Sequence, residues 1–205
     1  MPVVARGELT DEELILSCRD APPEKARAVV GELASRHIDR LTSFVHGIVG
    51  DWTGAQDVAQ EAFVRVYQHR ESYREVARFS TWLYTIARNL ALNELRNRTH
   101  RPRPMGGGAE GDDAGSAPAP EPAATGQGPL EAVARGDLRM VVRREIMSLP
   151  EHHRTVIVLC DLEQRPYAEA AEILGVPVGT IRSRLSRARE QLEQRLRGLL
   201  EEGAA

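Results

Sequence analysis

The side chains with the clearest chemical meaning lie near the end of the chain, between positions 178 and 190. Apolar residues recur there every three or four positions, which predicts one buried helical stripe. The opposite face carries arginines, which can bond guanine bidentately or hold phosphates, and serines, which let the backbone approach a base. We expect this helix to read a DNA major groove. The predicted contacts are Thr180, Arg182, Ser183, Arg184, Ser186, Arg187 and Arg189.

These residues are predicted to have two different roles. Arg182, Ser183, Ser186 and Arg187 share the outward face, so we expect them to meet base edges. Arg184 and Arg189 flank that face and are predicted to hold phosphates, which position a protein without specifying sequence.

The residues just before this helix are predicted to position it. Tyr167 to Leu174 has helical spacing, Gly175 can take the left-handed conformation that ends a helix, and Pro177 fits the first turn of the next. The pattern predicts a helix-turn-helix. A solvated basic helix is the alternative, but the preceding helix and the Gly-x-Pro turn favour DNA binding.

A second polar face follows Ser80-Thr-Trp82, which begins another predicted helix. Its outer side chains can bond bases or phosphates, and a cationic run from Arg98 to Arg103 continues them. For part of that run, the alternative is a structural role in complementing the helix dipole. The outer residues are Thr85, Arg88, Asn89, Asn93 and Arg96.

A third face, on a helix predicted from Asp57 to Arg70, carries Asp57, Gln60, Glu61 and Arg65. Its mixed signs are typical of a solvated surface. Taken alone, it indicates no partner.

The fold class follows from the spacing of apolar residues. Three-and-four spacing recurs along most of the 205 residues, aromatics make up only 4%, and alternating runs between turns are missing. We expect an all-α protein of two small helical domains joined by a flexible linker, the second containing the helix-turn-helix. The predicted parts are a tail (1–9), a first domain (10–101), a Gly/Ala/Pro-rich linker (102–129), a second domain (130–199) and a tail (200–205).

Further helices are predicted inside these domains. A Thr10 capping box opens a short helix that runs through Cys18, and a turn is predicted at 50–54. The linker would span on the order of 30 Å, enough to place two DNA-binding modules far apart on one duplex. The remaining predicted helices cover 24–48, 130–147 and 149–162.

Charge is unevenly distributed along the chain. The net charge is −3, yet residues 1–57 carry 10 acidic and 6 basic side chains, whereas residues 88–103 carry 5 arginines and one glutamate. An acidic front and basic patches predict weak DNA binding by the chain alone and the need for a partner.

The sequence indicates no disulfide framework, metal site or catalytic site. Cys18 and Cys160 are too few for a disulfide framework or a zinc site, and the adjacent His152 and His153 point to different sides of a helix. We expect no enzyme activity, no cofactor and no bound metal. No signal segment or membrane-length apolar run is present, so we expect a cytoplasmic protein.

Two separate motifs resemble the extracytoplasmic-function (ECF) group of the sigma-70 family, bacterial initiation factors that direct RNA polymerase to promoters. Residues Asp57-Val-Ala-Gln-Glu-Ala-Phe-Val-Arg-Val-Tyr67 and Phe79-Ser-Thr-Trp-Leu-Tyr-Thr-Ile-Ala-Arg-Asn89 look like sigma region two. Leu149-Pro-Glu through Arg189 looks like region four. The resemblance covers roughly residues 10–101 and 130–198, with no region three between them.

The resemblance implies roles for all three faces. Asp57, Gln60, Glu61 and Arg65 would dock on the polymerase clamp helices. The loop from Ser72 to Ser80 and the helix after it would open the −10 element, and the 178–190 helix would read the −35 element. The implied partners are core RNA polymerase (clamp helices and flap), promoter DNA and an anti-sigma factor, without membrane insertion. The implied −10 contacts are Arg74, Phe79, Thr85, Arg88, Asn89, Asn93 and Arg96.

The chain departs from the family pattern at two places. Glu75 and Val76 stand where the family loop usually has Gly and an acidic residue, and the segment from Asp20 to Leu33 lacks the usual Gly-Asp-x-x-Ala-Phe. A rival interpretation is an operator-binding helix-turn-helix regulator that acts without polymerase.

Overall fold

The structure is a computed structural model that describes residues 9–100 and 129–202. Almost all of the predicted linker, most of the predicted N-terminal tail and half of the predicted C-terminal tail lie outside the described residues. Within them every element is helical, so the all-α prediction is confirmed. The elements are α1 (Asp11–Ser17), α2 (Pro23–Val49), α3 (Trp52–His69), η1 (Arg70–Ser72), α4 (Phe79–His100), α5 (Pro129–Met147), α6 (Glu151–Ile157), η2 (Val158–Leu162), α7 (Tyr167–Leu174) and α8 (Val178–Glu202).

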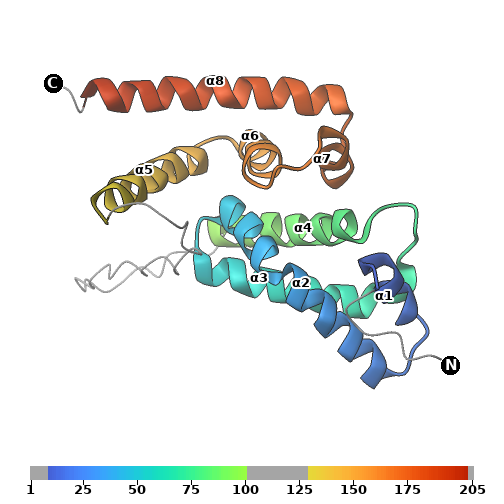
Figure 1. The fold of residues 1–205 in the computed structure, drawn as a ribbon. Coiled ribbons are helices and arrows are strands. Elements are labelled where there is room, and N and C mark those ends of the chain that lie inside the picture. Colours follow the sequence, from blue (N-terminus) through green and yellow to red (C-terminus); the bar gives the residue numbers. More distant parts are fainter. Residues whose placement is uncertain (1–8, 101–128, 203–205) are drawn as a thin grey trace.

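The first domain is a bundle of α2, α3 and α4, with α1 packed across α2 and α4 (Figure 1). Apolar stripes meet in its centre, where the rings of Phe44 and Tyr84 lie 4.8 Å apart and neither side chain is exposed. Burial of such stripes is the main term that stabilises a small helical domain.

The predicted capping box opens α1. Thr10 Oγ1 accepts a hydrogen bond of 3.2 Å from the Glu13 amide, and the Glu13 carboxylate accepts one of 2.8 Å from the Thr10 amide. The Leu9 carbonyl accepts a bond from Arg36. The last residue of the predicted N-terminal tail is therefore held against α2.

The turn predicted at 50–54 is shorter than expected. Gly50 ends α2 with a φ of 82°, and Asp51 then caps α3, accepting a hydrogen bond of 2.8 Å from the Gly54 amide. One left-handed residue and one cap complete the turn. As a result α3 begins at Trp52 and not at Asp57.

The second domain forms around α8, on which α5, α6 and α7 pack. The helix predicted from 149 to 162 is divided, because α6 ends at Ile157 and Val158–Leu162 form a π-helical turn. Gly175 closes α7 with a φ of 64°, as predicted. The final helix, α8, continues to Glu202, past the predicted end of the domain.

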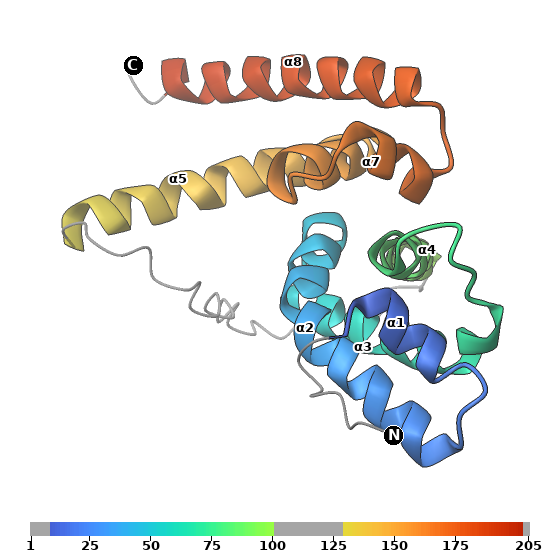
Figure 2. The same ribbon diagram turned by 45° about the vertical axis from the view of Figure 1, so that its right-hand side comes forward.

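The two domains lie against each other as two layers (Figures 1 and 2). Helix α7 contacts α4, and α5 and α6 contact α2. The sequence predicts two modules joined by a linker long enough to place them far apart on one duplex. In this structure the two domains share one continuous set of buried apolar residues.

Candidate nucleic-acid and polymerase interfaces

The first turns of α8 present the predicted base-reading face to solvent. Ile181, Leu185 and Ala188 are buried, at 0 to 2% exposure, and fix the rotation of the helix against α6 and α7. The four residues on the opposite side, Arg182, Ser183, Ser186 and Arg187, are all exposed. Thr180 is half-buried at the start of the helix, where its carbonyl accepts a hydrogen bond from Ser183.

The two flanking arginines differ in their surroundings. Arg189 forms a bidentate ion pair with Asp161 of η2, at 2.6 and 3.0 Å. Arg184 is half-buried and lies near His152, where its charge helps to lower the pKa of that imidazole, although burial contributes most. The Arg189 guanidinium therefore does not stand free beside the recognition face, as the helical pattern alone would suggest.

The polar face of α4 is partly open. Asn89, Asn93 and Arg96 are exposed, whereas Thr85 is half-buried and its hydroxyl donates a hydrogen bond to the Thr81 carbonyl. Arg88 is half-buried where the second domain meets α4, and its Nε atom has no hydrogen-bond partner among the described residues.

Phe79 requires a correction. The family resemblance implies a DNA contact here, but the side chain has no exposed surface, because its ring packs against Tyr73 and Trp82, 6.4 and 6.3 Å between centroids, and against His37. A ring without accessible surface cannot stack on a base. Phe79 is therefore a core residue that anchors the start of α4.

The loop before α4 is held by its own side chains. The Tyr73 hydroxyl donates a hydrogen bond of 3.0 Å to the Ala77 carbonyl, and burial, with Glu12 and Glu75 nearby, raises the pKa of Tyr73 to about 12. Arg74 Nη1 donates to the Glu71 and Tyr73 carbonyls. Val76 stands out at 94% exposure, at the position where the chain departs from the family pattern.

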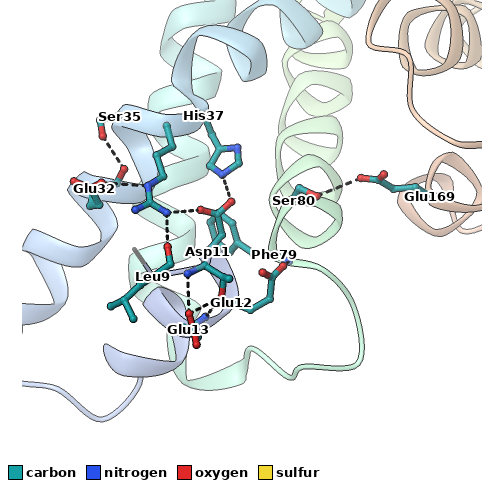
Figure 3. A network of polar contacts seen from close by, with 12 residues as sticks. Leu9, Asp11, Glu12, Glu13, Glu32, Ser35, His37, Phe79, Ser80 and Glu169 are labelled. Atoms are coloured by element: carbon teal, nitrogen blue, oxygen red, sulfur yellow. Dashed lines mark hydrogen bonds and ion pairs between the residues drawn. The ribbon is translucent and has the colours of Figure 1, made fainter. Parts of the chain in front are cut away.

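Sequence reasoning did not identify the residue that caps α4. The Glu12 carboxylate accepts a hydrogen bond of 3.0 Å from the Phe79 amide, which joins α1 to the first turn of α4 (Figure 3). Asp11 beside it contacts His37 at 2.6 Å (Figure 3), and it also contacts Arg36 at 3.1 Å. The only sequence feature that could have indicated this cap is the acidic first turn of α1. The capping box at Thr10 already accounts for acidic residues there.

The outer face of α3 carries the predicted partner-binding set. Asp57, Gln60 and Arg65 are exposed, and Glu61 is half-buried by its ion pair with Arg65 at 2.7 Å. Val64 lies between them at 45% exposure. The face therefore combines charge with a small apolar centre.

Comparison with known families matches both halves of the chain. Residues 33–101 match the family model for Sigma-70 region 2, and residues 139–192 match that for Sigma-70 region 4. The ECF RNA polymerase sigma factor SigW of Bacillus subtilis (strain 168) is 35% identical over 161 residues, which are 78% of this chain and 85% of that protein. The chain belongs to the ECF sigma factors of the sigma-70 family. It directs transcription initiation at promoters, which decides against the polymerase-independent regulator.

Other relatives of this sigma factor extend the match. The ECF RNA polymerase sigma-E factor of Escherichia coli (strain K12) is 39% identical over 196 residues, 94% of this chain and 97% of that protein. The fold resembles CnrH solved with the cytosolic domain of CnrY (TM-score 0.63, 23% identity, 92% of this chain and 97% of that one). It also resembles RpoE of Bartonella quintana solved with the anti-sigma factor NepR (TM-score 0.60, 24% identity, 82% and 96%).

Two kinds of feature are absent from the described residues of the sigma factor. No helix in the described ranges is both long enough and apolar enough to cross a membrane. Within the same ranges, His, Cys, Asp and Glu side chains form no group of three suited to a metal ion.

Proposed function

We propose that the first turns of α8 read the −35 element of the promoter. The exposed quartet of Arg182, Ser183, Ser186 and Arg187, set against a fully buried opposite stripe, is the observation that carries this assignment. A helix fixed in this way can insert two guanidinium forks and two small hydroxyls into a major groove, where they distinguish base pairs.

The −10 element binds along α4 and the loop before it. Asn89, Asn93 and Arg96 support this role because they are exposed along one helix, and Arg74 lies in the loop that precedes it. Thr85 and Arg88 border the same face. Phe79 is left out of this set and acts from the core, by holding the loop and the first turn of α4 in place.

The outer face of α3 docks on the clamp helices of core RNA polymerase. Asp57, Glu61 and Arg65 supply charges of both signs, Gln60 supplies a neutral amide, and the exposed Val64 supplies apolar contact area at the centre of the face. Protein interfaces combine a desolvated apolar centre with a polar rim in this way.

A separate anti-sigma factor controls access to these surfaces, in the cytoplasm where polymerase and DNA are found. The support is the pair of similar folds, one solved with the cytosolic domain of CnrY and the other with the anti-sigma factor NepR.

In vitro transcription tests the assignment of the three surfaces. The purified chain is added to core polymerase on a library of genomic fragments, and transcription start sites are mapped. We expect a small set of start sites that share −35 and −10 sequences. Arg187→Ala should change the −35 preference without preventing holoenzyme formation. If it instead prevents polymerase binding and leaves the start sites unchanged, the α8 assignment is wrong.

A further inference from the structure

All of the asparagines in this protein lie on one helix. The sequence contains Asn89, Asn93 and Asn97 and no other asparagine. Their spacing of four places them on one face of α4, and all three side chains are exposed. The buried side of the same turns is formed by Ala91 and Leu92, at 0 and 5% exposure. The helix therefore presents a continuous row of side-chain amides to solvent.

Helix stability does not explain this row. Asparagine forms helices less readily than alanine, because its side chain competes for backbone hydrogen bonds and favours turns and helix ends. Asn97 does not end α4, since the helix continues to His100. Within the part of the chain that the structure describes, the side-chain amides of Asn93 and Asn97 form no hydrogen bond. These amides are therefore open to a partner outside the chain.

The last turns of α4 are held in one orientation by Arg98, the residue after Asn97. Arg98 Nε donates a hydrogen bond of 2.8 Å to Glu94, and Arg98 Nη2 donates one of 3.0 Å to Asp51, which also caps α3. Gly54 leaves space for this guanidinium, because a Cβ at Gly54 would overlap Arg98 Nη2. Arg98 therefore ties the end of α4 to α3, and this fixes the exposed side on which Asn97 lies.

We propose that Asn97 is a third base-reading residue of α4, whose side-chain amide bonds the N6 and N7 edge of an adenine. The proposal rests on the assignment of α4 to the −10 element. An asparagine amide donates to N7 and accepts from the N6 amino group, a combination that only adenine offers in the major groove. From Asn89 to Asn97 the helix rises about 12 Å, the length of about three to four base-pair steps. Asn97 therefore reads a base beyond those that Asn89 and Asn93 reach.

Start-site mapping with variant holoenzymes tests whether Asn97 selects a base. Asn97→Ala raises helix propensity, so a loss of selectivity cannot come from a weakened helix. We expect aligned wild-type promoters to favour adenine at one position in or beside the −10 element, and Asn97→Ala promoters to lose that preference alone. Asn93→Ala should relax a different position. Gln194→Ala, which removes another exposed amide from α8, should change neither.

Three variants of α4 distinguish this inference from the assignment on which it rests. If Asn89→Ala and Asn93→Ala each relax one position and Asn97→Ala keeps every preference, Asn97 does not read a base although α4 binds the −10 element. If all three variants keep every preference, the −10 assignment of α4 is wrong and the inference about Asn97 is wrong with it.

Chemically altered promoters identify the atom that Asn97 contacts. 7-Deazaadenine lacks the N7 acceptor but still pairs with thymine, so it removes one of the two expected hydrogen bonds. At the selected adenine it should weaken promoter binding by wild-type holoenzyme about five- to tenfold and leave binding by the Asn97→Ala holoenzyme unchanged. Because the amide is neutral, both proteins should show the same salt dependence of binding. An equal loss in both proteins, or a smaller salt slope for Asn97→Ala, overturns the proposal.

Discussion

Arg189 of α8 and Asp161 of η2 form a bidentate ion pair with Nη2···Oδ1 and Nε···Oδ2 distances of 2.6 and 3.0 Å. The carboxylate occupies the same donor fork that a DNA phosphate would need, and it raises the pKa of Arg189. The pair also ties the recognition helix to the π-helical turn. Arg189 therefore positions α8 in the free protein, and it is not an open phosphate site.

Replacing Asp161 should release this arginine for DNA. We expect Asp161→Asn to cost under about 1 kcal/mol of stability, since more than half of the Arg189 side chain is exposed. Binding to duplex DNA of arbitrary sequence should tighten, with a salt slope steeper by about one. Glu193→Gln, which removes an exposed pair with Arg197 on the same helix, is the control. If both variants change the DNA affinity and the salt slope equally, the release of Arg189 from Asp161 does not add a DNA contact.

Arg187 and Arg184 should respond differently when the holoenzyme binds a promoter. Arg187 is exposed on the base-reading face, so Arg187→Ala should cost about 1 to 3 kcal/mol on the preferred −35 sequence and relax preference at one base pair. Arg184→Ala should weaken all sequences about equally and reduce the salt slope by about one. Titration of matched and base-substituted promoters at several salt concentrations measures both. The reverse pattern would mean that the helix is rotated in the groove.

Charge reversal on α3 should separate polymerase binding from folding. Glu61→Lys removes a half-exposed i, i+4 pair with Arg65 that stabilises the helix by only a few tenths of a kcal/mol. We expect weaker retention on immobilised core polymerase and unchanged helical circular dichroism. Glu24→Lys makes the same charge change and also breaks an exposed pair, with Arg27 on α2, so it should bind normally. Unchanged retention of Glu61→Lys would remove this residue from the docking face.

Glu12 should stabilise the first turn of α4. Glu12→Ala leaves the Phe79 amide without its acceptor, which we expect to cost about 1 to 2 kcal/mol in urea unfolding. Glu12→Gln keeps an acceptor oxygen but loses the charge that favours a helix N-terminus, so its cost should be smaller. Equal losses from the two variants would indicate that the hydrogen bond contributes little and the charge contributes most.

Cys160 should react slowly with alkylating reagents. Burial, and the neighbouring Asp161 carboxylate, raise the pKa of its thiol to about 11. Because the thiolate is the nucleophile, its alkylation rate should keep rising through about pH 10 without a plateau. Peptide mapping by mass spectrometry separates it from the buried Cys18. In Asp161→Asn the plot of alkylation rate against pH should move to lower pH. A plateau near about pH 9 in the wild type, close to the ordinary thiol value, would contradict a raised pKa for Cys160.

Local rules determined much of this protein from its sequence alone. The capping box at Thr10, the left-handed Gly175 and the buried stripe of Ile181, Leu185 and Ala188 are specified by residues within a turn or two of one another. That stripe also fixes which side of α8 faces solvent. The outward quartet of the recognition helix therefore follows from the helical period of the apolar residues.

Tertiary structure decided what depends on residues distant in the chain. The sequence around Phe79 does not show that His37 of α2 will pack against its ring. No residue near Phe79 in the sequence indicates that Glu12 will accept a hydrogen bond from its amide and cap α4. The Asp161 partner of Arg189 likewise comes from another element of the second domain. The close approach of Gly47 to Val158 joins residues of the two different domains. Periodicity shows which face of a helix is buried, but only the packed structure shows what buries it.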